Sequence, residues 1–278
     1  MRDLRRRAAE RLREAGVASP ERDADLLLAH VLGIGLGRLP LVDGLDAAQR
    51  EAYDALLARR ADREPLQHLT GTAAFRHVEL AVGPGVFVPR PETELLAGWA
   101  IDAARAVEGT PVVADLCTGS GAIARAVADE VPGAEVHAVE LDEAALAWAE
   151  RNLAGTGVDL RHGDLATAFD DLAGRFDVVV CNPPYIPLEA WESVAAEARD
   201  HDPHLALFSG QDGLDAMRVL ERRAALLLRP GGVVGAEHAD VQGESAPGVF
   251  RATGRWRDVA DHLDLAGRPR YLTARLAR

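Results

Sequence analysis

The chain has 278 residues, of which 48% are apolar and 27% charged, so neither intrinsic disorder nor a fibrous repeat describes it. Its net charge of −13 argues against general binding to duplex DNA, which depends on basic side chains at the phosphates. All 31 basic residues are Arg, which excludes a lysine nucleophile. The longest mostly apolar run, 26–37, is shorter than the ~20 residues that a membrane span needs.

The first part of the chain shows the periodicity of a small helical bundle. Apolar residues recur on one face over 3–15, and the spacing predicts further helices over 21–32 and 46–62. A Ser-Pro pair directly before the second helix supplies a cap and a helix-starting proline. Acids interleave with the N-terminal arginines and no signal-peptide core follows them, so we expect a cytoplasmic protein.

After this bundle the apolar period changes to two. The alternation over 75–87, with Gly83-Pro84-Gly85 as a turn, predicts a β-hairpin. We therefore expect a helical domain over 1–72, a hairpin linker over 73–90 and a further domain over 91–278.

From residue 91 onward helices and strands alternate. The expected strands are 112–116, 135–139, 159–162, 176–181 and 232–237, and the expected helices are 92–107, 122–130, 143–153 and 214–228. Repeated β-α units predict an α/β fold, a mostly parallel sheet with helices on both faces. Residues 257–263 and 270–276 are expected to form a final antiparallel pair.

Ligands of open α/β sheets bind beyond the carboxyl ends of the strands. The first expected strand is followed by Thr118-Gly119-Ser120-Gly121, where two glycines allow a tight turn and close approach of a ligand. Glu140 follows the second strand, where an acid can accept from both hydroxyls of a ribose. The pattern indicates an adenosine-containing cofactor, although it also fits a nicotinamide dinucleotide.

Asp164 follows the third expected strand and allows two interpretations. Its carboxylate could accept from the amino group of an adenine. It could equally cap a helix over 165–172.

Asn182-Pro183-Pro184-Tyr185 follows the fourth strand and is the most informative segment of the chain. Two prolines end the strand and fix the backbone. The Asn182 side-chain oxygen and the Pro183 carbonyl could accept both hydrogens of a planar NH₂ group, with Tyr185 covering its flat face.

This arrangement suits methyl transfer to an amide or aromatic amine nitrogen from a sulfonium donor in the glycine-rich loop. Such catalysis needs positioning and electrostatics without a covalent intermediate. A hydride-transferring enzyme has no use for the Asn182–Tyr185 clamp. His201, Asp202 and His204 have no metal-ligand spacing, so we expect a solvated loop there and no metal.

At these residues the chain resembles the class I S-adenosylmethionine-dependent methyltransferases with an NPPY motif. It resembles more closely the release factor glutamine methyltransferases (the HemK/PrmC family), along almost its whole length. Residues 64–71 (EPLQHLTG) are similar to that family's bridge between domains, and 88–94 (VPRPETE) to its signature. Further similar segments are 115–123, 182–185, 202–207, Glu237-His238 with Gln242-Gly243, and 264–270 (DLAGRPR).

The resemblance implies a Rossmann-like methyltransferase domain over 91–278 and a substrate-recognition domain over 1–72. It implies S-adenosylmethionine as cofactor and, as substrate, the Gly-Gly-Gln glutamine of class 1 peptide chain release factors. The product would be N5-methylglutamine, with an effect on translation termination.

The resemblance also implies roles for single residues. Asn182 and the Pro183 backbone would hold the glutamine amide, with Pro184 and Tyr185 lining its slot. The cofactor-binding set would be Phe87, Thr118, Gly119, Ser120, Gly121, Glu140, Asp164 and Asn182. Phe87 would lie near the methyl donor, or alternatively in the hairpin core.

The acids of the signature have a plainer interpretation. Glu92 and Glu94 suit a helix N-terminus through its dipole, and Arg90 would pair with one of them.

Four positions depart from the family pattern. Cys117 stands where many relatives carry a small residue, and we expect it to pack rather than react. The others are Leu165 in place of an aromatic residue, Asp202 in place of Glu, and Ala239 after Glu237-His238.

Two other functions stay open at this stage. An adenine-N6 methyltransferase would use the same NPPY slot on a flipped base, but it should carry a basic groove that this acidic chain lacks. A cofactor-binding scaffold without activity is disfavoured by the intact Asn182 and Tyr185. We therefore expect a protein partner, with neither DNA nor a membrane bound directly.

Overall fold

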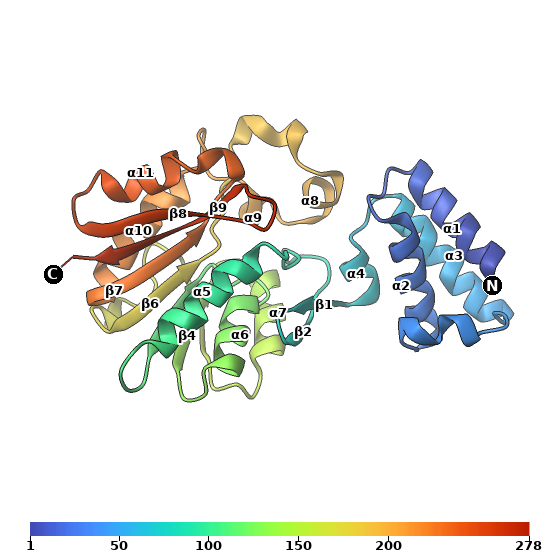
Figure 1. Ribbon diagram of the computed structural model, residues 1–278, viewed down its shortest axis with the longest axis horizontal. Coiled ribbons are helices and arrows are strands. Elements are labelled where there is room, and N and C mark those ends of the chain that lie inside the picture. The colour runs from blue at the N-terminus through green and yellow to red at the C-terminus, as the bar shows by residue number, and fades with distance from the viewer. Residues whose placement is uncertain (278) are drawn as a thin grey trace. The chain divides into compact units, whose positions relative to one another are not determined.

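A computed structural model describes residues 1–277 of the chain. The chain forms two compact units, and each is described by itself. The first comprises Met1–Thr72, Val82–Pro84 and Ala195–His201, and the second comprises the remaining described residues. Figure 1 shows the N-terminal helices of the first unit in blue, its segment 195–201 in yellow, and the sheet of the second unit in green to red.

The first unit is the predicted helical bundle. Its elements are α1 (Arg2–Glu14), α2 (Pro20–Leu32), η1 (Leu36–Leu41), α3 (Ala47–Ala61) and α4 (Leu66–Thr70). The three helices expected from periodicity are thus confirmed to within two residues. Leu12, Leu27 and Tyr53 are fully buried between them. The Tyr53 hydroxyl donates to the Ala24 carbonyl at 3.0 Å, which satisfies its polar end inside the core.

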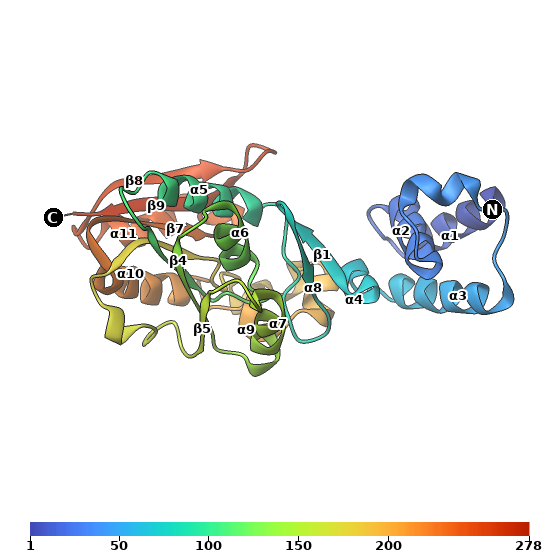
Figure 2. The ribbon, with the colours of Figure 1, turned by 90° about the horizontal axis from the view of Figure 1, so that it is seen from below.

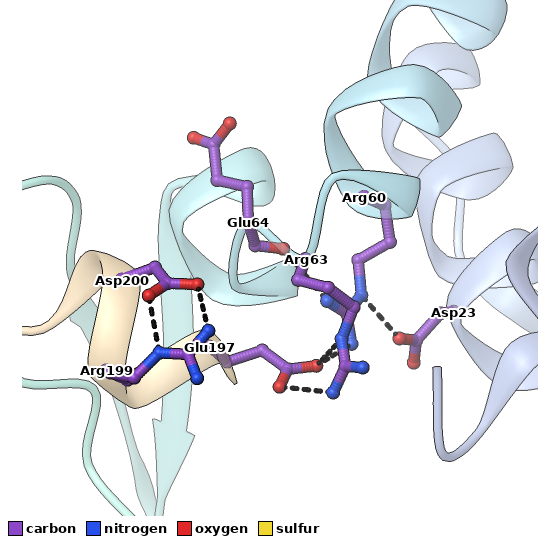
Figure 3. A network of polar contacts seen from close by, with 7 residues as sticks. All are labelled: Asp23, Arg60, Arg63, Glu64, Glu197, Arg199 and Asp200. Atoms are coloured by element: carbon purple, nitrogen blue, oxygen red, sulfur yellow. Dashed lines mark hydrogen bonds and ion pairs between the residues drawn. The ribbon is translucent and has the colours of Figure 1, made fainter. Parts of the chain in front are cut away.

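A short helix from far along the chain completes this unit. In α8 (Ala196–His201), Glu197 accepts from Arg63 Nη2 at 2.6 Å and from Arg60 Nη2 at 3.0 Å (Figure 3). Arg60 also donates from Nε to Asp23 of α2 at 2.8 Å, so one buried arginine joins two carboxylates. Arg60 and Arg63 are more than 130 positions from Glu197, and no pattern in the sequence predicts that they pair.

The predicted hairpin forms, but it lies earlier than expected. Its strands are β1 (Thr72–Phe75) and β2 (Val78–Ala81), which form a sheet of two strands. Arg76 takes the left-handed conformation in the turn, with φ 51°. Gly83-Pro84-Gly85 therefore lies after the hairpin rather than at its turn.

The second unit is built on seven strands in the order β5-β4-β3-β6-β7-β9-β8. Their bounds are β3 (Val112–Leu116), β4 (Glu135–Glu140), β5 (Asp159–His162), β6 (Phe176–Cys181), β7 (Leu228–Glu237), β8 (Trp256–Leu263) and β9 (Pro269–Leu276). The strands from β5 to β7 pair in parallel, while β9 is antiparallel to both β7 and β8. The predicted fold class and the antiparallel C-terminal pair are confirmed.

Helices cover both faces of this sheet (Figure 2). They are α5 (Thr93–Arg105), α6 (Ala122–Glu130), α7 (Glu143–Leu153), α10 (Asp215–Leu227) and α11 (Ser245–Arg251). Val234 and Ala236 of β7 share one core with Leu220 of α10 and Phe250 of α11. Gly235, between them, faces the opposite side of the sheet, where α5 packs. A Cβ on Gly235 would lie 2.3 Å from the Trp99 ring of α5. The absence of a side chain lets α5 lie close to the sheet.

The segments whose secondary structure the sequence did not predict correctly are short or irregular. Residues 165–172 form turns and only η2 (Asp170–Leu172), so the alternative of a helix capped by Asp164 is wrong. Between β6 and α10 lie η3 (Leu188–Ser193), α8 and α9 (His204–Leu207), so His201 and His204 of the expected loop belong to short helices. Within residues 1–277 no helix has the length and apolar character to cross a membrane.

Candidate active site

The candidate site lies at the carboxyl ends of β3, β4, β6 and β7. Because these strands are parallel, the residues that follow them meet at one edge of the sheet. The chain runs from β3 to β4 on one side and returns to β6 on the other, which makes the β3–β6 boundary a switch point. The glycine-rich loop and the Asn-Pro-Pro-Tyr segment leave the sheet on either side of it.

The glycine-rich loop after β3 is built from left-handed residues. Cys117, Gly119 and Gly121 have φ values of 60°, 56° and 83°. A Cβ on Gly119 would meet nothing within 4 Å, so the space beside this residue is open. The loop can therefore receive a ligand directly against its backbone, and Cys117 packs against the sheet core as expected.

Asp115 supports this loop from the end of β3. Its Oδ2 accepts from the Thr118 hydroxyl at 2.6 Å and from the Ala124 amide at 3.0 Å. Complete burial raises the pKa of Asp115 to about 7, against these two donors. Its Oδ1 is buried and has no hydrogen-bond partner within the described residues.

Glu140, at the end of β4, lies directly against the loop. Its Oε2 accepts from the Gly119 amide at 2.8 Å, and its Oε1 from the amides of Leu141 and Asp142 at 2.9 Å each. Burial raises the pKa of Glu140, while the backbone donors oppose the rise. The structure thus brings together the acid and the glycine that the sequence singled out.

Asp164 lies at the exposed end of this row of acids. Its Oδ1 accepts from the Ala166 amide at 2.7 Å, which closes a turn. Leu165, one of the departures from the family pattern, is buried in the core of the second unit.

The Asn-Pro-Pro-Tyr segment leaves β6 beside a buried carboxylate. Asn182 Nδ2 donates to the Thr93 hydroxyl at 3.3 Å, and the Tyr185 hydroxyl donates to Glu237 Oε1 at 3.1 Å. Thr93 in turn donates to Glu237 Oε2 at 2.7 Å. Gln242 donates to the Tyr185 carbonyl at 3.1 Å and holds the backbone of the segment.

Burial changes the acidity of this group of residues. It raises the pKa of Tyr185, as the nearby Glu237 charge also does, so the tyrosine stays a hydroxyl donor at any physiological pH. It raises the pKa of Glu237 too, although hydrogen bonds from Thr93 and Tyr185 and the charge of Arg270 oppose the change.

The residues before α5 form a second layer of contacts. Arg90 lies over the Phe87 ring at 4.9 Å and pairs with Asp202 at 2.7 Å. The expected pairing of Arg90 with Glu92 or Glu94, its neighbours in sequence, is therefore wrong. Glu92 is the N-cap residue of α5 and Glu94 lies in its first turn, as predicted.

Phe87 and Asp202 lie in surroundings other than those expected from the sequence. Phe87 lies outside the hairpin strands, so it is not part of the hairpin core. The Asp202 segment is no solvated loop, because the Asp202 side chain is fully buried beside Arg90. No group of His, Cys, Asp or Glu suited to a metal occurs within the described residues.

Three contributors to the site were not predicted from the sequence as such. They are Thr93, Glu237 and Arg270, which come from the PRPETE, Glu-His and DLAGRPR segments. Each belongs to a segment that resembles the family's pattern, but the resemblance implies no role for the individual residue.

Comparisons with known proteins show the family of this chain. The family described as "PrmC N-terminal domain" matches residues 3–71, and the one described as "Methyltransferase small domain" matches residues 100–200. A release factor glutamine methyltransferase from Streptomyces coelicolor is 60% identical over 97% of this chain and 96% of its own. A 4-amino-L-phenylalanine/4-methylamino-L-phenylalanine methyltransferase from Streptomyces pristinaespiralis is 43% identical over 90% of this chain and 86% of its own.

Among solved structures, the hMettl16 catalytic domain in complex with MAT2A 3′UTR hairpin 6 has a TM-score of 0.53 to this chain. The similarity covers 70% of this chain and 75% of that one at 15% identity, and it concerns the fold alone.

Proposed function

We infer that this chain, which belongs to the family of release factor glutamine methyltransferases, acts on the glutamine of the Gly-Gly-Gln motif in class 1 peptide chain release factors. A methyl group would pass from the sulfonium sulfur of S-adenosylmethionine, which leaves as a thioether, to the side-chain amide nitrogen, N5, of that glutamine. The nitrogen would lose one of its two hydrogens as a proton. The near-complete alignment with the Streptomyces coelicolor relative supports the assignment.

The observation that carries this proposal is the placement of Asn182 and Tyr185. Both side chains are held by hydrogen bonds at the end of β6, next to the glycine-rich loop across the switch point. The Asn182 side-chain oxygen and the Pro183 carbonyl are two acceptors for the two hydrogens of an amide NH₂. Pro184 and Tyr185 line the slot.

The residues after β3, β4 and β5 fit an adenosine-containing cofactor. Gly119 leaves open space, and Glu140 is fixed beside it as an acceptor for ribose hydroxyls. Thr118, Ser120 and Gly121 complete the loop, with Asp164 toward the adenine and Phe87 toward the methyl donor. Methyltransferases of this class use S-adenosylmethionine, which supplies a methyl carbon on a sulfonium centre.

The chain's own contribution to catalysis is orientation. An amide nitrogen is a poor nucleophile because its lone pair is delocalised into the carbonyl. Two acceptors on its hydrogens increase the electron density on nitrogen and aim the lone pair at the methyl carbon. Fixed acceptors need no reorganisation during the reaction, which is the main source of rate in such sites.

We propose further that residues 1–72 recognise the release factor, that 73–90 link them to the rest, and that 91–278 carry catalysis. The match of residues 3–71 to a family domain of its own supports a separate role for the first segment. Release factors act at ribosomes, so we propose that the protein works in the cytoplasm.

Mass spectrometry tests the function directly. A purified class 1 release factor is incubated with the protein and S-adenosylmethionine, and the Gly-Gly-Gln peptide is sequenced. We expect one added methyl group on the glutamine. An unmodified glutamine, together with methylation of 4-amino-L-phenylalanine or of an adenine oligonucleotide in parallel reactions, would assign the same site to another NH₂ acceptor. The first of these is the kind of amine on which the Streptomyces pristinaespiralis relative acts, by its name.

A further inference from the structure

One buried carboxylate connects both side chains of the Asn-Pro-Pro-Tyr clamp. Glu237, the last residue of β7, accepts from the Tyr185 hydroxyl at 3.1 Å and from the Thr93 hydroxyl at 2.7 Å. The Thr93 oxygen accepts from Asn182 Nδ2 at 3.3 Å. Glu237 and Thr93 are 1% and 4% exposed, so water cannot replace these partners freely.

The direction of each hydrogen bond in this chain of contacts follows from its chemistry. An ionised carboxylate only accepts, so the hydroxyls of Thr93 and Tyr185 both point their hydrogens at Glu237. A hydroxyl has one hydrogen, so the Thr93 oxygen can only accept from Asn182. The Asn182 amide must therefore turn its NH₂ toward Thr93 and its oxygen the other way.

We propose that Glu237 is a positioning residue that decides which end of the Asn182 amide faces the acceptor glutamine. An asparagine by itself could present either end, because its oxygen and nitrogen ends are nearly equal in shape. With the amide reversed, Asn182 would direct hydrogens at an acceptor NH₂ that itself carries hydrogens, and the clamp would repel its substrate. The inference rests on the proposed function, since it concerns the same NH₂ acceptor.

Three neighbours of Glu237 stabilise the ionised form that this role requires, although burial raises the pKa of the carboxyl overall. Arg270 lies close enough to Glu237 and Tyr185 for its charge to act on both, and it is held by Asp264 at 3.2 Å. Burial and the charge of Glu92 act in the opposite direction and raise the pKa of Glu237. The two hydroxyl donors and Arg270 thus offset part of the desolvation of the carboxylate.

The chain offers a matched control for this carboxylate. Glu221 of α10 is 2% exposed and accepts from the Thr253 hydroxyl at 2.9 Å and the Trp256 indole at 2.7 Å, and Arg255 Nε lies 3.1 Å from its Oε1. Like Glu237, it therefore has a hydroxyl donor, an aromatic donor and an arginine nearby, and none of these three partners is a candidate site residue. Its replacement reports what the loss of a buried carboxylate does to the fold alone.

The experiment compares Glu237→Gln, Thr93→Val, Thr93→Ser and Glu221→Gln with the wild-type chain. The measurements are kcat and KM with a class 1 release factor, the Kd of S-adenosylmethionine and the melting temperature. We expect Glu237→Gln to lower kcat by about 10²-fold and Thr93→Val by about tenfold, because both release the amide of Asn182 from a single orientation. Cofactor affinity should stay within about twofold in both, since the loop contacts are untouched.

Thr93→Ser keeps the hydroxyl and should restore most of the rate that Thr93→Val loses. Glu221→Gln should keep the wild-type kcat while lowering the melting temperature. A wild-type kcat in Glu237→Gln would overturn the inference, as would a loss of cofactor affinity equal to the loss of rate.

If Glu237→Gln unfolds, Thr93→Val decides, and a wild-type rate in that variant also overturns the inference. If the wild-type chain leaves the glutamine unmodified, the proposed function fails and this inference with it. A normal wild-type rate beside an unaffected Glu237→Gln rejects the inference alone.

Discussion

Glu197 of the first unit and Glu237 of the second are held by opposite chemistry. Glu197 accepts from two arginines, Arg60 and Arg63 (Figure 3). Burial alone would raise its pKa, but the arginine hydrogen bonds outweigh this and bring the pKa to about 2. Glu237 accepts from two neutral hydroxyls, and burial raises its pKa.

The difference separates a carboxylate that stabilises from one that orients. The hydrogen bonds from the arginines stabilise ionised Glu197 by more than its desolvation destabilises it, so the ionised form favours the folded state. The hydrogen bonds from the two hydroxyls stabilise ionised Glu237 by less than its desolvation destabilises it. Ionisation of Glu237 is therefore unfavourable for folding. Groups of the second kind persist at sites where function needs them.

The largest expected effect is at the end of the Glu237 network that faces substrate. Asn182→Ala removes one of the two acceptors for the glutamine amide and should lower kcat by about 10³-fold. Cofactor affinity should change little, because the glycine-rich loop and Glu140 are intact. Isothermal titration with S-adenosylmethionine beside the methylation assay checks both. A parallel loss of cofactor affinity would show that Asn182 holds the cofactor instead.

The next effect is on pH dependence. Only ionised Glu237 forces both hydroxyls to donate, so kcat should fall on the acid side, starting above the ordinary glutamate pKa of 4.5. Below the raised pKa the fall should be about tenfold per pH unit. The charged or titratable groups that act on Glu237 are Arg270, Tyr185 and Glu92, with Asp264 beyond Arg270. A pH–rate profile that keeps its acid limb in Glu237→Gln would assign the limb to another group.

Ionised Glu237 should lower the free energy of unfolding, whereas an ordinary ion-paired acid raises it, and the variant Glu237→Gln should show this difference. Since the folded pKa lies above the unfolded one, ionised Glu237 weakens folding as pH rises through that range. At neutral pH the variant should therefore melt no lower than the wild type. Any gain should disappear below about pH 4.5, where the carboxyl is protonated in both states. Thermal melts at pH 4 and pH 7.5 measure this.

Glu197→Gln should affect stability rather than chemistry. Its folded pKa of about 2 lies below the unfolded value of 4.5, so its contribution is present above pH 4.5 and is lost as pH falls toward 2. We expect the variant to lose about 1–2 kcal/mol of unfolding free energy at neutral pH, because solvent screens part of the interaction. Denaturant unfolding at pH 7 and pH 3 should show a smaller difference at the lower pH.

The smallest effect is expected from a neighbouring ion pair on the same helix. Asp200 and Arg199 pair at 2.7 Å at the surface of α8. Solvent and salt compensate for the loss of such a pair, so Asp200→Asn should leave the melting temperature unchanged within error. An effect as large as that of Glu197→Gln would mean that α8 as a whole, rather than its charge pairing, stabilises the first unit.

The sequence predicted the regular elements well and the contacts between distant segments poorly. The strand FDVVVC is a continuous apolar run between a turn and two prolines, and it matches β6 (Phe176–Cys181) without error. The helices with a clear 3.6-residue period also appear where expected. Such patterns depend only on neighbours along the chain.

The misses have a common cause. The sequence predicts a partner for Arg90 two or four positions away, at Glu92 or Glu94, but its partner is Asp202, which is 112 positions away. The same holds for Thr93 with Glu237, 144 positions apart. Which polar groups are buried together is decided by the packing of the sheet and its helices. Residue order carries no direct record of it.

The first unit is not one continuous stretch of chain. Its bundle needs Val82–Pro84 and Ala195–His201, which return from the second unit. A chimera that exchanges only the first 72 residues between two relatives would leave Glu197 beside foreign partners. Chimeras of these enzymes should therefore fold more often when residues 195–201 are exchanged together with the N-terminal segment. The same dependence should appear as coevolution between the two segments.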